Sequence, residues 1–346
     1  MTIARSFDFF FQWHLTERCN LSCRHCYQSG GEVAELSTDE ARELLAEVRE
    51  MLDEWRETYG VNFSPSCNIT GGEPLLRDDL FPLIKESVSA GFAPFLLTNG
   101  TLIDRATAQE LKRVGVRGVQ VSMEGPEPIH DDIRGPGSFQ AASRGVAALV
   151  AADLPVTINV TLSRMNASAM EEMPTIARNL GATRLGFSRY VPAGQGLSLL
   201  SQALSPAELY PLYQKLLSQQ QPGIDIVTGD PMANQLNQPA PDSPAPLPVG
   251  GCAAAVSGIT IMADGTLVPC RRLPIPIGNI RHDSLRQLWA TAPLLVALRD
   301  QSQYEGKCAS CKRWGDCRGC RAIAYGYSVA TGRENPLAAD PHCFID

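Results

Sequence analysis

A strand-then-helix pattern repeats through the first two-thirds of this chain and limits the folds open to it. Short apolar runs that end in turn residues predict strands, and longer amphipathic stretches predict the helices between them. Alternation of this kind predicts an α/β fold, in which the connecting helices cover a parallel sheet. The predicted strands cover residues 9–16, 66–70, 93–98, 118–122, 156–162 and 184–188.

The helices between these strands complete six β/α units. The first begins at the capping sequence of residues 37–40 and ends near Tyr59, and the others cover residues 78–90, 104–114, 138–151 and 169–180. Six units are two short of a closed (β/α)8 barrel, so we expect a partial (β/α)6 TIM-like barrel with a bridging helix at residues 206–220. Functional residues of such barrels gather at the C-terminal ends of strands. This rule predicts a site near Cys19, Glu73, Asn99, Ser122 and Arg189.

Three cysteines follow the first predicted strand on one short loop. Cys19, Cys23 and Cys26 have the spacing C-x3-C-x2-C. Three thiolates fit three corners of a [4Fe–4S] cube and leave the fourth iron open to bind a substrate. From the spacing alone, a zinc knuckle or a set of buried cysteines also stays open, because C-x2-C occurs in zinc half-sites.

A second motif, Gly71-Gly72-Glu73-Pro74, follows the second predicted strand. Glycine lets the backbone approach a ligand closely, and a carboxylate accepts a charge-assisted hydrogen bond. Together, the cysteine and glycine motifs resemble the radical S-adenosylmethionine (SAM) superfamily. The resemblance implies that the open iron chelates the amine and carboxylate of SAM. One electron then releases a 5′-deoxyadenosyl radical, which abstracts hydrogen from the substrate.

The same resemblance implies which residues contact SAM. For His25, a surface position on a loop is the alternative, and for Arg134 a structural ion pair is as well supported as a bond to the SAM carboxylate. Arg189, at the end of the sixth predicted strand, is expected to face the site. The implied SAM contacts are His25, Gly71, Gly72, Glu73, Ser122, Glu124 and Arg134.

Seven further cysteines lie beyond a proline-rich stretch, at positions 252, 270, 308, 311, 317, 320 and 343. Their spacing resembles the SPASM domain, which carries auxiliary iron–sulfur clusters. Two residues separate Cys317 from Cys320 where the family pattern has three, so the role of Cys320 is open. The expected organisation is a radical SAM core at residues 1–237, a linker at 238–250 and the SPASM domain at 251–346, with a hairpin at 259–268.

The SPASM resemblance implies two auxiliary clusters, and so three [4Fe–4S] clusters in all. No fourth cysteine follows the first ligand of the first auxiliary cluster, because residues 253–256 are Ala, Ala, Ala and Val. One iron of this cluster is therefore expected to have no cysteine ligand. A zinc ribbon of Cys308, Cys311, Cys317 and Cys320 is the alternative. Cys67 is expected to pack as a small apolar residue in its strand. The implied ligand sets are Cys252, Cys270 and Cys320, and Cys308, Cys311, Cys317 and Cys343.

Bulk properties exclude several classes of protein. The net charge is −7, and no stripe of Lys, Arg and aromatic residues indicates nucleic-acid binding. No segment is apolar enough to span a bilayer, and the first residues lack a secretory signal. The 11 cysteines therefore predict metal sites in a reducing cytoplasm rather than disulfides.

These features predict a radical SAM/SPASM enzyme that cleaves SAM reductively and receives electrons from a partner such as flavodoxin or ferredoxin. Most relatives with this C-terminal domain modify ribosomally made peptides, so a peptide is the first substrate class expected. Sulfatase maturation is disfavoured, because Arg271 stands where those enzymes carry a catalytic Asp. A non-catalytic electron-transfer protein is a further alternative, but a carrier gains nothing from a SAM pocket.

Side-chain removal or decarboxylation of a tetrapyrrole in heme synthesis is the second substrate expectation. The chain begins only a short stretch before Cys19, so no leader-peptide-binding domain is expected at its N-terminus. The pair Arg271-Arg272 suits propionate carboxylates, because guanidinium groups bind carboxylates in a bidentate fashion. The alternative for this pair is that it offsets the charge of a cluster.

Overall fold

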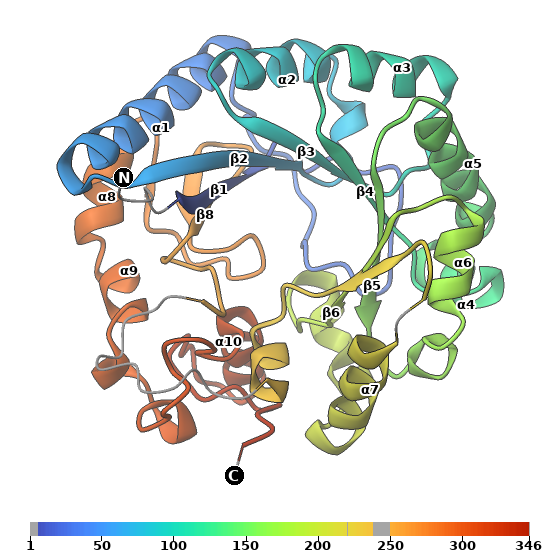
Figure 1. The fold of residues 1–346 in the computed structure, drawn as a ribbon. Coiled ribbons are helices and arrows are strands. Elements are labelled where there is room, and N and C mark those ends of the chain that lie inside the picture. Colours follow the sequence, from blue (N-terminus) through green and yellow to red (C-terminus); the bar gives the residue numbers. More distant parts are fainter. Residues whose placement is uncertain (1–5, 220, 238–249, 346) are drawn as a thin grey trace, which may run out of the picture.

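The first six strands form a parallel sheet in chain order, as the alternation of strands and helices predicts (Figure 1). The structure is a computed structural model that describes residues 6–219, 221–237 and 250–345. The predicted partial barrel is confirmed, and several strands extend beyond their predicted ends. The strands are β1 (Ser6–His14), β2 (Asn62–Thr70), β3 (Ala93–Thr98), β4 (Gly118–Ser122), β5 (Val156–Leu162) and β6 (Arg184–Arg189).

The helices cover the outer face of this sheet (Figure 1). In the first of them, the predicted capping box is present, since the Ser37 side chain accepts a bond from Glu40 N and the Glu40 side chain bonds back. One face of that helix, including Leu44, Val48 and Met51, is buried against the sheet. Gln220, the predicted end of the bridging helix, lies outside the described residues. The helices are α1 (Thr38–Tyr59), α2 (Leu80–Ser89), α3 (Arg105–Arg113), α4 (Glu127–Arg134), α5 (Ser138–Ala151), α6 (Met173–Asn179) and α7 (Pro206–Ser218).

Two strands besides the six predicted barrel strands lengthen the sheet, one at each edge. β7 (Asp225–Val227) pairs in parallel with β6, and β8 (Gly258–Ile261) pairs in parallel with β1. The predicted hairpin is present as β8 and β9 (Thr266–Val268), followed by the short β10 (Gly278–Asn279). At the β8 edge, a Cβ on Gly258 would come within 2.6 Å of the Phe10 ring, so glycine allows this pairing. The cysteine-rich region is thus continuous with the barrel sheet.

The C-terminal helices are α8 (Leu285–Thr291), α9 (Pro293–Leu298) and α10 (Arg321–Ala330). Trp289 of α8 packs its ring 5.4 Å from Phe9 and 5.6 Å from Trp55, measured between centroids, so the region is joined to β1 and α1 by an aromatic cluster. Residues 238–249 of the predicted linker lie outside the described residues, and the division into domains stays a prediction. Short 3₁₀ helices occupy Pro74–Leu76, Ala167–Ala169, Gly194–Gln202, Pro231–Leu236, Gln301–Gln303 and Gly306–Cys308.

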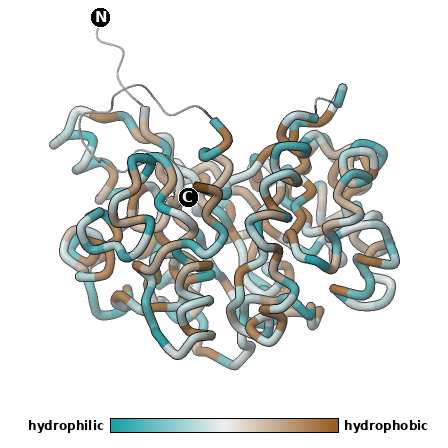
Figure 2. Tube along the Cα trace, turned by 90° about the horizontal axis from the view of Figure 1, so that it is seen from below, coloured by the Kyte–Doolittle hydropathy of each residue, from teal (hydrophilic) through white to brown (hydrophobic). Residues whose placement is uncertain are grey.

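Hydrophobic and hydrophilic residues alternate along the coloured part of the trace (Figure 2). In the part of the chain that the structure describes, no helix is long and apolar enough to cross a membrane.

A buried ion-pair network ties the end of β6 to the C-terminal segment. Arg189 donates to Asp230 (Nε–Oδ2 2.6 Å) and to Asp340 (Nη2–Oδ2 2.9 Å), and all three side chains are excluded from solvent. Asp340 also accepts a bond from the backbone N of Cys320 at 2.7 Å. Burial alone would raise the pKa of Asp340, but the attraction of Arg189 holds this pKa well below its usual value. Arg189, which was expected to face the site, therefore has its guanidinium engaged by two carboxylates.

Replacing Asp340 by Asn should destabilise the fold, because Arg189 would lose one of two buried counter-charges while the shape of the side chain is kept. Breaking a buried pair from one side costs about 3 kcal/mol or more in the free energy of unfolding. The measurement is thermal unfolding at matched iron content. Glu305→Gln is the control, because it breaks only the exposed pair with Arg333 and should change stability by less than about 1 kcal/mol. If Asp340→Asn and Glu305→Gln both change the stability by the same small amount, the buried network does not stabilise the fold as described.

Candidate functional site

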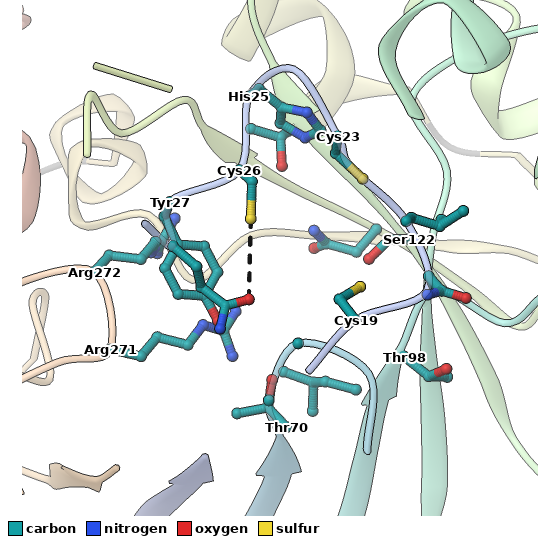
Figure 3. Close-up of a pocket in the computed structure, with 18 of the residues that line it drawn as sticks. Cys19, Cys23, His25, Cys26, Tyr27, Thr70, Thr98, Ser122, Arg271 and Arg272 are labelled. Atoms are coloured by element: carbon teal, nitrogen blue, oxygen red, sulfur yellow. Dashed lines mark hydrogen bonds between the residues drawn. The ribbon is translucent and has the colours of Figure 1, made fainter. Parts of the chain in front are cut away.

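The three N-terminal cysteines face one cavity at the C-terminal ends of the barrel strands (Figure 3). The cysteine loop, defined here as residues 15–28, follows β1. Its Cys19, Cys23 and Cys26 line the cavity together with Ser122. Within the described residues, no three His, Cys, Asp or Glu side chains are placed to hold a single metal ion. The three thiols line an open cavity, and thiolate sulfur is the kind of ligand that holds iron–sulfur clusters.

The Gly71-Gly72-Glu73 segment holds one end of the cysteine loop through its backbone. Gly72 N donates to Thr16 O at 2.7 Å, and Glu73 N donates to Arg18 O at 2.8 Å. A Cβ on Gly71 would lie 2.7 Å from Thr16 O, and one on Gly72 would overlap the carbonyl of Arg18. The two glycines are therefore needed for this close approach. Both also line the cavity, as expected for backbone near SAM.

A second glycine segment, after β6, holds the other end of the loop. Gln195 N donates to Gln28 O at 3.0 Å, and Gly196 N donates to Cys26 O at 2.8 Å. Gly194 has a φ of +55°, and a Cβ there would overlap the carbonyl of Tyr27. Sequence reasoning missed this segment. The available signal was a pair of closely spaced glycines, Gly194 and Gly196, a few residues after the predicted strand at residues 184–188.

The Glu73 carboxylate contacts other protein groups and does not line the cavity. It accepts bonds from Thr98 Oγ1 at 2.7 Å and Asn99 N at 2.8 Å, and it is completely buried. Burial raises its pKa, although these hydrogen bonds oppose the shift. The Asn99 side chain in turn donates to Asn20 Oδ1 at 2.8 Å, in the cysteine loop. Glu73 thus fixes the turn after β3 against that loop.

Three of the other predicted SAM contacts form a buried ion cluster behind the cysteine loop. Glu124 accepts from Arg134 Nε at 2.9 Å and from Thr161 N at 2.8 Å, and it lies 3.2 Å from His25 Nε2. Arg134 also reaches Cys23 Sγ at 3.7 Å and lines the cavity with His25, whereas Glu124 does not. The structure therefore contains the ion pair that the sequence left as the alternative for Arg134.

The buried surroundings of the three thiols favour the protonated form. The thiols must therefore lose protons when they bind metal. Burial is the largest influence and raises the pKa of Cys19, Cys23 and Cys26, while Arg134 acts in the opposite direction on each. Thiolates are the form that binds iron, so cluster assembly has to be coupled to proton release.

The C-terminal cysteines separate into two groups. One cavity is lined by Cys308, Cys311, Cys317 and Cys343, and another is lined by Cys252, Cys270 and Cys320. This is the division that the SPASM resemblance implies. Cys320 lines the second cavity and not the first, so the alternative of a zinc ribbon would need cysteines from both cavities. Cys67 is fully buried in the apolar core, as expected.

Two families match the sequence in its two halves. Residues 13–173 match the radical SAM superfamily, and residues 252–320 match an iron–sulfur cluster-binding domain named SPASM. The AdoMet-dependent heme synthase of Methanosarcina barkeri (strain Fusaro) is 31% identical over 96% of this chain and 95% of that protein. The chain belongs to the radical SAM superfamily. Its resemblance to radical SAM/SPASM enzymes is thereby confirmed.

Other radical SAM proteins are similar over most of the chain. The mycofactocin maturase MftC of Mycobacterium tuberculosis (strain H37Rv) is 30% identical over 95% of this chain and 82% of that protein. The structure of Streptococcus suis SuiB bound to its precursor peptide SuiA has a TM-score of 0.77 at 18% identity, covering 98% of this chain and 76% of that chain. The similarity to SuiB shows only that the two proteins share a fold.

Membership of the family establishes the chemistry in outline. The protein is a radical SAM enzyme, and its cofactors are [4Fe–4S] clusters and SAM. The alternative of a non-catalytic electron carrier is set aside by this result.

Replacing Gly194 by Ala should prevent assembly of the cluster at the cysteine loop, because the new Cβ would displace the backbone at Tyr27. After anaerobic reconstitution, iron analysis should show a loss of about four irons per chain relative to the wild type. Gly223→Ala is the matched control: Gly223 has a φ of +83° but nothing within 4 Å of a new Cβ. Full iron content in Gly194→Ala would show that cluster assembly does not depend on this glycine segment.

Proposed function

We propose that this enzyme uses SAM-derived radical chemistry to decarboxylate a propionate side chain of a tetrapyrrole. The observation that carries the proposal is a pair of arginines on the cavity wall, Arg271 and Arg272 (Figure 3). Nε and Nη1 of Arg271 and Nε of Arg272 are shielded from solvent without a hydrogen-bond partner. Buried cationic groups without partners are unfavourable, so this wall suits an anionic group of the substrate.

The charges around the cavity support an anionic substrate. No Asp or Glu is among the described residues that line it, because Glu73 and Glu124 lie behind the lining and bond to other protein groups. The Arg271 guanidinium lies 5.6 Å from the centre of the Tyr27 ring, an arrangement that favours a cation without neutralising it. Its charge is therefore available to a carboxylate beside the cysteine loop.

The two arginines have different surroundings. Arg272 also lines the cavity of Cys252, Cys270 and Cys320. Burial would lower the pKa of Arg272, but the Cys270 and Cys320 thiolates raise it above its usual value. We infer that Arg272 offsets the charge of an auxiliary cluster, whereas Arg271 binds the substrate carboxylate.

Similarity to AdoMet-dependent heme synthases supports a tetrapyrrole as the substrate. Biological tetrapyrroles carry propionate side chains. Loss of one hydrogen atom from a propionate methylene, of CO2 and of one electron would convert the side chain into a vinyl group. When bound, the iron–sulfur clusters supply the electron that splits SAM into methionine and a 5′-deoxyadenosyl radical, and accept the electron released by the substrate.

The cluster ligands are part of the proposal. Cys19, Cys23 and Cys26 hold the SAM-binding cluster, with Ser122 and the backbone of Gly71 and Gly72 beside SAM. Electrons come from a flavodoxin or ferredoxin in the cytoplasm. The proposed auxiliary ligands are Cys252, Cys270 and Cys320 for one cluster, and Cys308, Cys311, Cys317 and Cys343 for the other.

Peptide modification, the first expectation from the sequence, is the second candidate. Similarity to the maturase MftC supports it. A peptide with a free C-terminus also presents a carboxylate that Arg271 could bind. A peptide and its C-terminal amide therefore form a second arm of the test.

A porphyrin with propionate side chains should stimulate 5′-deoxyadenosine formation by the reconstituted enzyme, and Arg271→Gln should raise the KM for this porphyrin. Loss of a hydrogen bond to a charged group is worth about 1.5–3 kcal/mol, or about a tenfold to hundredfold change. SAM cleavage without porphyrin should not change, because only binding common to ground and transition states is lost.

Arg333→Gln, at an exposed position, controls for loss of a positive charge. A porphyrin that leaves SAM cleavage unchanged would overturn the proposed substrate class. A normal KM in Arg271→Gln would show that Arg271 does not bind the substrate carboxylate, and would remove the structural support for a propionate at this wall. Stimulation by a peptide and not by porphyrin would favour the second candidate.

A further inference from the structure

Behind the arginine pair, the inner face of the sheet carries a layer of side-chain amides. Gln12 of β1, Asn68 of β2, Gln120 of β4 and Asn159 of β5 line an inner cavity. We call these four residues the amide layer. Interiors of βα barrels are ordinarily filled by branched apolar side chains, so a polar lining of this extent needs a separate explanation.

The register of the sheet sets part of this layer side by side. Gln12 lies opposite Asn68 on β2 and opposite Thr260 on β8. Thr260 Oγ1 donates to Gln12 Oε1 at 3.3 Å. Within the described residues, the side chains of Asn68, Gln120 and Asn159 make no hydrogen bond to protein groups. Three amides therefore have their donors and acceptors available to whatever enters the cavity.

A glycine keeps room for one of these amides. Gly186 of β6 lies opposite Asn159 in the parallel register. A Cβ at Gly186 would come within 2.9 Å of Asn159 Oδ1, so any other residue would push the amide aside. The space around Asn159 thus depends on the absence of a side chain on the neighbouring strand.

The inner cavity connects the two sites already described. It shares Gln120, Asn159 and Arg271 with the cavity of the cysteine loop. It shares Gln12, Arg272 and Cys320 with the cavity of Cys252 and Cys270. Arg271 therefore borders both the cavity of the cysteine loop and the cavity of the amide layer.

The charge of the inner cavity indicates the kind of group that it accepts. Its single acidic lining residue among the described residues is Asp230, and this carboxylate is engaged by Arg189. Arg271 and Arg272 at its mouth have unpartnered nitrogen atoms. Amide N–H groups donate to carboxylates, and the acidic side chain of the lining is already paired.

We propose that the amide layer is a second subsite, which binds another carboxylate-bearing arm of the substrate whose reacting arm is held at Arg271. The inference rests on the proposed function, because it takes the substrate to be a tetrapyrrole with several propionates. The enzyme should then distinguish porphyrins by the number of propionates that they carry.

Asn68→Asp tests this subsite, because it adds a negative charge in the layer with almost no change in shape, and Asn68 does not line the cavity of the cysteine loop. The reconstituted protein is titrated anaerobically with two metal-free porphyrins, one with four free propionates and one in which three of the four are methyl esters, and binding is followed by porphyrin fluorescence and calorimetry. The variant should weaken binding of the four-propionate porphyrin by about tenfold or more, through like-charge repulsion, and bind the porphyrin with a single free propionate as the wild type does.

Two further variants make the result decisive. Asn62→Asp makes the same change at an exposed position of β2 and should have no effect. Gln12→Glu repeats the charge change from β1 in case Asn68→Asp does not fold. If the wild type binds neither porphyrin, the proposed function fails. If the wild type binds both and the charge variants weaken both equally or neither, the subsite is overturned while the proposed function stands.

Discussion

The site depends on backbone hydrogen bonds that other loops make to the cysteine loop. Amides from the segment after β2 and from the segment after β6 bond to carbonyls near its two ends, and Arg24 N donates to Ile133 O at 2.9 Å in its middle. Such bonds require main chains to lie closer than side chains usually permit, so glycine stands at Gly72 and Gly194. The three thiols face one cavity because the parallel sheet brings these loops to one end of the barrel.

Charge is distributed so that the interior favours anions. Acidic groups near the site are paired with arginines: Glu124 pairs with Arg134, and Asp230 pairs with Arg189. Arg271 and Arg272 project into the cavity without acidic partners. The buried network around Arg189 also includes the backbone of Cys320 through Asp340, so the position of this proposed auxiliary-cluster ligand depends on the end of β6.

The sequence predicts the barrel and the cysteines well because both depend on local patterns. Apolar periodicity identifies β1–β6, and cysteine spacing identifies the family. Long-range pairing is not local, so the parallel contact of β8 with β1 could not be predicted from the hairpin alone. α4 was missed because it is short, with Pro126 before it and Gly135 after it. Glu73 shows a further limit: its motif predicts a place near SAM, but its hydrogen bonds to Thr98 and Asn99 depend on the packing of a neighbouring strand.

The most direct test of the account follows the hydrogen atom. A porphyrin deuterated at its propionate methylenes is incubated with the reconstituted enzyme, SAM and a reductant, and both products are examined by mass spectrometry. The account predicts deuterium in 5′-deoxyadenosine and a porphyrin that has lost CO2 from a propionate. 5′-Deoxyadenosine without deuterium, together with an unchanged porphyrin, would contradict it.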